Sequence, residues 1–476
     1  MKYILAIIPI FFLMSCVNSL EDYNIDSKKP SSVAAETLVS NAQKAMNDWQ
    51  NSVNVNTNVF RFYAQQITAT EYLDEPRYDM VTRTIPEALW NAMYVSSLAD
   101  LNEAKRLIDK DNLLNADVKK NQLAIIDLLE VYCYSILVNT FGDIPYTEAL
   151  DVNNPQPKFD DAKTVTSDLL SRLATSTANL NENAGSFSVA ADIIYGGKAS
   201  KWVKFGNSLR MKIAMITADA DEGLAKSNVS AAAGDLSKLI TTNADNAVFK
   251  YQAAPNNNIL SNDVPPRSSR KDFVSANTLV DKMNTLNDGR LGSYFSKVGD
   301  AFVGGIYGQK NTYSKFSTFS TKVISTTLPG DMLDAAEVNF LLAEAVERGF
   351  ISGSAKDFYN AAIAASFEYW DVGSADDYIA QAGVDYDNAG SGATWREKIG
   401  TQKWIALFNR GYDAWTSWRQ LDFPVLLPPD APNVPEIPVR LIYPIVENSL
   451  NKANIEAAAS KIGGDTPNTK LWWDVR

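Results

Sequence analysis

Four tyrosines in two loop-like segments are the residues of this chain best suited to bind a ligand. Tyr72 and Tyr78 belong to the stretch TEYLDEPRYD, and Tyr307 and Tyr313 belong to GGIYGQKNTYSK. Neither stretch has the apolar periodicity that would bury a ring. A tyrosine ring can cover the apolar face of a sugar or of a peptide side chain while its hydroxyl meets water. The pattern therefore predicts four stacking surfaces for a ligand.

Two further residues of the first loop could direct hydrogen bonds to such a ligand. Asp74 and Arg77 stand between its two tyrosines and would bind hydroxyls or backbone amides. We predict that the loops around residues 70–80 and 305–316 come together as one shallow binding site. The alternative is that each tyrosine only pins its own loop. In that case the next candidate is the loop at 371–394.

The composition around these residues supports loops rather than helices. Between residues 250 and 330 the chain is rich in Asn, Ser, Pro and Gly interleaved with aromatic residues, which predicts long loops with short strands. The 371–394 loop carries Tyr378 and Tyr386. Binding residues are found disproportionately on loops that a rigid scaffold positions.

The residue inventory argues against most kinds of catalysis. The chain has no histidine, which excludes Ser-His-Asp and Cys-His nucleophile systems and the usual zinc sites. With 56 acidic residues, pairs of carboxylates occur everywhere and are no evidence for glycoside hydrolysis. We therefore expect a binding protein and no enzyme, with a carboxylate-dependent glycoside hydrolase as the less favoured alternative.

Cofactors and nucleic acid are also not indicated. The glycine-containing stretches GGDTPN and VGGIYG do not continue into a phosphate-binding motif. The segment DNAGSG resembles part of a calcium loop but lacks its alternating acids, so we expect no cofactor and leave a structural calcium ion open. A net charge of −12 repels phosphate backbones, which excludes nucleic acid as a probable partner.

The N-terminus has the pattern of an exported and lipidated protein. Residues 1–15 contain Lys2 and then an apolar run of about twelve residues, too short for a membrane-spanning helix, which needs about 20. The LMSC sequence that follows resembles a bacterial lipobox, so we predict that Cys16 is lipidated. Residues 16–32 then form a polar tether. The other cysteine is Cys133, so the mature protein can form no intrachain disulfide.

The rest of the chain, residues 33–476, is predicted to be one mainly α-helical domain. Apolar residues recur at helical spacing from Trp90 to Ile108, and the second half of residues 118–141 is apolar on nearly every side, which predicts an interior helix. The late tryptophans also keep helical spacing and are interpreted as core. The segment 335–369 predicts a helix pair broken at GFISGS. It matches five of eight positions of the tetratricopeptide pattern, which are Leu342, Ala343, Ala355, Tyr359 and Ala362.

Several segments from residue 139 to the C-terminus resemble the SusD/RagB family of outer-membrane lipoproteins, and in particular its SusD-like nutrient-binding branch. Among them are NTFGDIPYTEAL, TQKWIALFNRGYDAWTSWR, IPVRLIYPIVEN and the terminal WWD. The resemblance implies a right-handed superhelix of tetratricopeptide-like helix pairs with a loop-rich region packed on it. No ligand-contact motif of the family can be carried over to a residue of this chain.

The resemblance also implies a function. Members of this family sit at the cell surface and deliver oligosaccharides, or in some cases peptides, to a SusC-like TonB-dependent transporter. Glu21 and Asp22, soon after Cys16, resemble the surface-export signal of such lipoproteins. We therefore expect a surface-exposed, lipid-anchored protein of the outer membrane that captures oligosaccharides. Peptide cargo is the nearest alternative.

Overall fold

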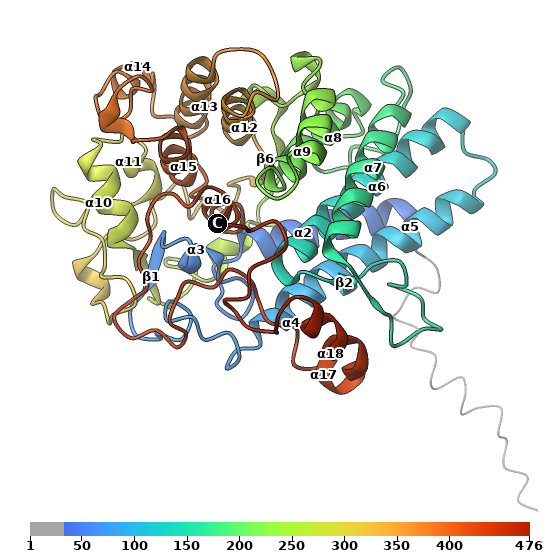
Figure 1. Ribbon diagram of the computed structural model, residues 1–476, viewed down its shortest axis with the longest axis horizontal. Helices are drawn as coiled ribbons and strands as arrows, with labels where there is room; N and C mark the ends of the chain where they lie inside the picture. The colour runs from blue at the N-terminus through green and yellow to red at the C-terminus, as the bar shows by residue number, and fades with distance from the viewer. Residues whose placement is uncertain (1–32) are drawn as a thin grey trace, which may run out of the picture. The chain divides into compact units, whose positions relative to one another are not determined.

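The computed structural model describes residues 33–476 of the chain. The predicted signal peptide at 1–15, the predicted lipidation at Cys16 and the predicted tether at 16–32 lie outside the described residues. Residues Ala35–Arg476 form one compact unit, which is mainly helical (Figure 1).

Its α-helices are α2 (Ala35–Asn51), α3 (Phe60–Tyr63), α4 (Ile85–Trp90), α5 (Ala99–Lys110), α6 (Ala116–Phe141), α7 (Ala162–Asn179), α8 (Ala199–Ile216), α9 (Glu222–Ala232), α10 (Asn277–Thr285), α11 (Leu291–Tyr294), α12 (Ala335–Glu347), α13 (Ala355–Tyr369), α14 (Asp376–Ile379), α15 (Trp395–Ala406), α16 (Gly411–Leu421), α17 (Glu447–Leu450) and α18 (Lys452–Lys461). A π-helix, η2 (Asn91–Leu98), and the short 3-10 helices η3 (Leu236–Lys238), η4 (Asn243–Asp245), η5 (Ile259–Asn262), η6 (Tyr313–Lys315) and η7 (Ala389–Ser391) complete the helical elements. The strands are β1 (Ile67–Ala69), β2 (Ile144–Pro145), β3 (Phe159–Asp160), β4 (Ala247–Phe249), β5 (Phe273–Ser275) and β6 (Gly330–Leu333).

Successive long helices pack side by side, as a helical-repeat scaffold requires. Helix α6 contacts α7, α7 contacts α8, α8 contacts α9, and α12 contacts α13 (Figure 1). Several of these helices begin at a side chain that accepts a backbone N–H, which satisfies an otherwise free donor. Asp161 caps α7, Asp334 caps α12 and Ser354 caps α13 in this way. The expected mainly α-helical, tetratricopeptide-like fold is confirmed.

The best-predicted helix pair has the expected break. Helices α12 and α13 are separated by residues 348–354, where Gly349 and Gly353 have positive φ angles of 68° and 144° that favour glycine. Leu342, Tyr359 and Ala362 are fully buried, in agreement with the repeat pattern.

Two other predicted helical segments also bury the expected residues. The stripe from Trp90 to Ile108 is buried, but its helix is continuous through α4, η2 and α5 and contains eight residues of π-helix that the α periodicity did not predict. Helix α6 is long and apolar enough to cross a membrane, yet most of its apolar stretch is buried inside the fold. It is therefore a core helix, as predicted.

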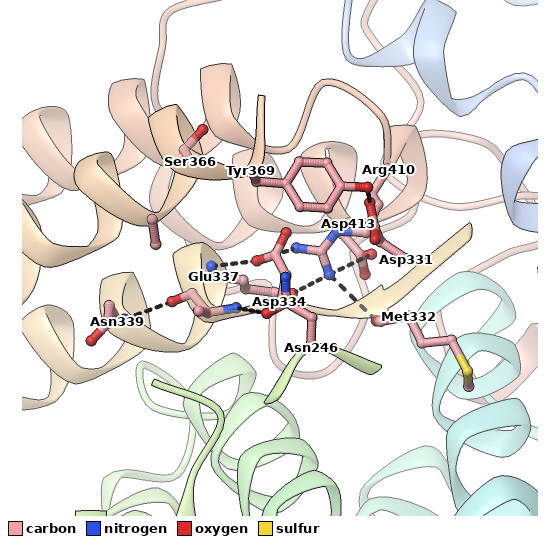
Figure 2. A network of polar contacts seen from close by, with 12 residues as sticks. Asn246, Asp331, Met332, Asp334, Glu337, Asn339, Ser366, Tyr369, Arg410 and Asp413 are labelled. Carbon is pink, nitrogen blue, oxygen red and sulfur yellow. Dashed lines mark hydrogen bonds and ion pairs between the residues drawn. The ribbon is translucent and has the colours of Figure 1, made fainter. Parts of the chain in front are cut away.

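A buried polar network joins the scaffold helices to strand β6 (Figure 2). The Arg410 guanidinium lies 2.7 Å from Glu337 Oε2 and 3.2 Å from Asp334 Oδ1, both at the start of α12. The Tyr369 hydroxyl at the end of α13 donates to Asp331 Oδ2 on β6 at 2.7 Å. Asp413 accepts from Lys212 of α8 at 2.6 Å. Charged groups this deeply buried are stable only when they are paired.

The loop-rich region is held to the scaffold by short antiparallel strand pairs. Strand β1 pairs with β5, with Ile67 opposite Ser275 and Ala69 opposite Phe273. This pairing places the segment after Ala69 beside the segment before Phe273, although the two are about 200 residues apart in the sequence. Residues 250–330 contain the predicted loops and short strands, together with the helices α10 and α11.

Candidate functional site

The two loops predicted to bind a ligand lie against each other. Arg77 Nε of the first loop donates to the Gly308 carbonyl of the second at 2.9 Å. The Asn311 backbone N–H donates to the Thr70 carbonyl at 2.9 Å, and the Asn311 side-chain amide donates to the Ala69 carbonyl at 3.0 Å. The structure therefore brings the loops at 70–80 and 305–316 together.

Two of the four tyrosine rings are not available to a ligand. Tyr78 is 1% exposed, and its ring meets the edge of the Tyr63 ring with centroids 5.7 Å apart. Tyr307 is 7% exposed, and its hydroxyl donates to the Phe62 carbonyl at 2.7 Å. Burial raises the pKa of Tyr78 to about 12 and the pKa of Tyr307 well above its usual value. The prediction that these two rings are open stacking surfaces is wrong, because the loops fold onto the core and use both rings to pin themselves.

The other two tyrosines do reach the surface. Tyr72 is 57% exposed and lines a hollow of about 370 Å³ together with Arg83. Tyr313 is half-buried and lines two further hollows, of about 470 Å³ and about 300 Å³. The Arg83 guanidinium lies 5.7 Å from the centre of the Tyr72 ring, and Lys271 Nζ lies 5.7 Å from the centre of the Tyr313 ring.

One carboxylate is shared by all three hollows. Asp272 lines each of them, and Arg270 and Phe273 line two. Asp272 Oδ2 accepts from Arg270 Nε at 2.7 Å. We call these three adjoining depressions the Asp272 hollows. They combine aromatic faces with charged hydrogen-bonding groups, which is the chemistry needed to hold a polar ligand that also has apolar faces.

Asp272, Arg270 and Lys271 were not predicted from the sequence. They follow a Ser- and Pro-rich stretch that carries no local signal of a site. Their position depends on the β1–β5 pairing, and is reinforced where the Thr70 hydroxyl donates to the Lys271 carbonyl at 2.8 Å.

The two polar residues that were predicted have partners within the protein. Arg77 holds the second loop through Gly308, and Asp74 lies 3.4 Å from the Arg83 guanidinium. Neither is among the residues that line the Asp272 hollows. Their binding of a ligand stays a prediction.

The alternative site at 371–394 does not offer open rings. Tyr378 is 4% exposed, and its hydroxyl exchanges hydrogen bonds with the Gln402 side chain. Tyr386 is 8% exposed and donates to Glu347 Oε1 at 2.7 Å. Both rings belong to the core, so the expectation that they could serve as a second choice of binding surface is wrong.

The structure offers no obvious metal site in the part of the chain that it describes. Residues 33–476 contain no group of three or more His, Cys, Asp and Glu side chains placed to hold a metal ion. In the DNAGSG segment, Asp387 pairs with Lys356 at 2.6 Å, and Asn388 accepts from the Gly390 N–H.

Taken as a whole, the fold is a helical-repeat scaffold that carries loop-lined surface hollows. A SusD-like family, described as starch-binding and associating with the outer membrane, matches residues 27–444. The chain belongs to this family, which confirms the resemblance found in the sequence.

Solved structures of SusD homologues resemble the whole fold. A chitin-binding protein is 24% identical, with a TM-score of 0.80, and the match covers 93% of this chain and 100% of that one. A chitin-binding SusD homologue from Flavobacterium johnsoniae is 23% identical, with a TM-score of 0.78, over 92% of this chain and 99% of that one. A SusD homologue from Bacteroides uniformis is 26% identical, with a TM-score of 0.76, over 94% and 100%. No protein of the curated set matches the sequence.

Proposed function

We propose that this protein is a surface-exposed lipoprotein of the outer membrane that captures oligosaccharides in the Asp272 hollows. It delivers them to a SusC-like TonB-dependent transporter. The observation that carries this proposal is the pair of accessible rings, Tyr72 and Tyr313, in hollows that adjoin at Asp272.

The chemistry of the Asp272 hollows suits a carbohydrate. The Tyr72 and Tyr313 rings can each cover the C–H face of one sugar ring. Asp272 can accept hydrogen bonds from hydroxyls, and Arg270 and Lys271 can donate them. Because the three depressions share lining residues, one chain of several sugars can lie across them. Two of the solved relatives are named as chitin-binding, which also favours a glycan as cargo.

Peptide cargo is the second candidate. An extended peptide would use the same rings for its side chains and the same charged groups for its backbone amides. Among the described residues, none that lines the Asp272 hollows selects a peptide over a glycan. A ligand screen must therefore include both.

Hydrolysis of the bound glycan is disfavoured by the acids present. Glu71 and Asp272 are the carboxylates that line the Asp272 hollows. Glycosidases require one acid that gives up a proton and a second that acts as base or nucleophile. Here Asp272 is already held by Arg270, which favours a role in binding.

The membrane anchor and the partner complete the proposal. Lipid on Cys16 would tether the domain beside the transporter, which raises the local concentration of captured cargo and makes modest affinity sufficient. Purification of the tagged native protein in mild detergents should recover a partner of the size of an outer-membrane barrel. Recovery of the monomer alone, in every detergent tried, would count against the complex.

A ligand screen tests the capture function directly. The purified full-length protein is applied to an array of oligosaccharides and to a peptide library, and bound glycans are then incubated with the protein and analysed by chromatography. We expect binding to a set of related glycans without breakdown products. Binding to peptides alone would support the second candidate, in which the cargo is a peptide. Steady release of products from a glycan would overturn a purely binding role.

A further inference from the structure

More basic than acidic side chains line the Asp272 hollows. Their lining contains four basic side chains, Arg83, Arg270, Lys271 and Lys310, and two acidic ones, Glu71 and Asp272. The whole chain has 44 basic residues against 56 acidic ones. Which of these basic groups can attract an anion depends on which of them are not already paired with carboxylates of the protein.

Both arginines of this lining are already committed to carboxylates of the protein. Arg83 forms ion pairs with Glu75 and with Asp74. Arg270 pairs with Asp272 at 2.7 Å and lies 3.7 Å from Asp263. Each guanidinium therefore faces two carboxylates of the protein, which leaves neither arginine free to bind an anionic ligand.

Both lysines are uncommitted. Within residues 33–476, neither Lys271 Nζ nor Lys310 Nζ has a carboxylate within 4.0 Å or a hydrogen-bond acceptor. Both are exposed, and both line the hollow of about 470 Å³ that also contains Tyr313 and Glu71. Glu71 and Asp272 are the carboxylates of this hollow, and because Asp272 is held by Arg270, Glu71 is the one left to face the two uncommitted ammonium groups.

We propose that the captured glycan carries an anionic group, a carboxylate or a sulfate, that is bound by Lys271 and Lys310 while a sugar ring faces Tyr313. This inference rests on the proposed function and specifies the class of glycan. Tyr313 and Lys271 already lie 5.7 Å apart, measured from ring centre to Nζ, so one acidic sugar can contact both. The two lysines come from segments before β5 and after Tyr307, which the fold unites at one hollow.

The competing interpretation is that the two lysines only keep the surface hydrated. Exposed ion pairs contribute little individually, and salt screens them. In that case neutral and acidic glycans of the same length would bind with equal affinity. Removal of both lysine charges would change neither affinity. The two interpretations therefore differ in measurable affinities.

The test compares matched tetrasaccharides on the full-length protein by calorimetry at low and at high salt. Chitotetraose serves as the neutral ligand, unsulfated chondroitin tetrasaccharide supplies carboxylates, and chondroitin sulfate tetrasaccharide adds sulfate, so a preference among the last two separates the two anion sources. An array of neutral and acidic glycans extends the comparison to other backbones. The variants are Lys271→Gln with Lys310→Gln, and, as a matched control, Lys226→Gln with Lys461→Gln, which removes two exposed lysines on α9 and α18.

We expect acidic glycans to bind more tightly than neutral ones, and more weakly at high salt. The Lys271/Lys310 double variant should lose about tenfold in affinity for them. The control variant should bind as the unmodified protein does. Binding confined to neutral glycans, or an unchanged affinity of the double variant for acidic ones, would overturn this inference and leave the capture function standing. Failure to bind any glycan would instead overturn the proposed function.

Discussion

Arg77 Nε donates a hydrogen bond to the Gly308 carbonyl at 2.9 Å and so joins two segments that are 231 residues apart in the chain. The loop that carries Tyr72 and the loop that carries Tyr313 are therefore parts of one surface. Because a charged donor holds a backbone carbonyl, Arg77 acts on the site through the position of the second loop.

The two accessible tyrosines should account for much of the affinity. The double variant Tyr72→Ala with Tyr313→Ala should weaken glycan binding roughly tenfold or more, if each ring contributes roughly 1 kcal/mol. Calorimetry with a ligand found on the array measures the loss, and circular dichroism checks the fold. Leu113→Ala, at a residue that is 97% exposed in another part of the chain, is the control. An unchanged affinity in the folded double variant would place the site elsewhere.

The two buried tyrosines should affect stability in different ways. Tyr307→Phe removes the hydroxyl that donates to the Phe62 carbonyl, so the free energy of unfolding should fall by about 1 kcal/mol. The Tyr78 hydroxyl is buried without a hydrogen-bond partner of standard geometry, so Tyr78→Phe should cost less or be neutral. Denaturant titration compares the two variants. An equal loss in both would show that the Tyr78 hydroxyl is satisfied in solution.

Asp331 should make stability depend on pH. Burial, together with the nearby Asp334, raises its pKa to about 7, while Tyr369, Arg410 and Asn409 oppose the shift. The folded protein then holds a proton that the unfolded chain releases near pH 3.8, so this contribution to stability is complete below that pH and is lost as pH rises through about 7.

The substitution Asp331→Asn imitates the protonated carboxyl and keeps an acceptor for the Tyr369 hydroxyl. The variant should be about as stable as the unmodified protein near pH 4 and more stable near pH 8, with a difference of up to about 4 kcal/mol. Denaturant titrations at several pH values measure that difference. A difference that does not change with pH would show that Asp331 does not titrate in this range.

Arg410 should be essential to the buried polar network shown in Figure 2. The variant Arg410→Met leaves Asp334 without its cation and leaves Glu337 and Asp413 to share Lys212. Loss of one partner from a buried ion pair typically costs 3–5 kcal/mol, so we expect a loss of about 4 kcal/mol. Thermal unfolding checks this against Arg106→Met, which removes an exposed arginine of α5 and should change stability little. An equal loss of stability in the two variants would mean that the buried network stabilises the fold no more than an exposed ion pair does.

Cys16 should carry the membrane anchor. Acyl labelling in cells should mark the unmodified protein and leave Cys16→Ala unlabelled, because the thiol is the predicted attachment point. Protease added to intact cells should digest the unmodified protein if it faces outward. Absence of label from the unmodified protein would refute lipidation, and complete resistance to protease in intact cells would argue against surface exposure.

The helical scaffold could be predicted because its signals are local. Apolar spacing over a few turns of helix is enough to predict burial in three segments, which are the stripe from Trp90 to Ile108, the apolar helix within 118–141 and the pair at 335–369. The residues of the stripe, the second half of 118–141, and Leu342, Tyr359 and Ala362 of the pair are buried in the structure as predicted. The π-helical section at Asn91–Leu98 was missed, because its residues still satisfy an α-helical spacing closely enough to look regular.

The sequence by itself therefore determined the mainly helical scaffold, the family and the two loops that carry exposed aromatic residues. The tertiary structure alone decided which of those residues face solvent. Tyr78 and Tyr307 resemble Tyr72 and Tyr313 in sequence context, but the loops dock on the core at Tyr63 and Phe62 and bury them. It also decided that Asp272 and Lys271 line a hollow with Tyr313, because strand pairing between β1 and β5 is a contact between distant segments. Local periodicity holds no information about such contacts, since the energy that selects them arises when distant surfaces pack together.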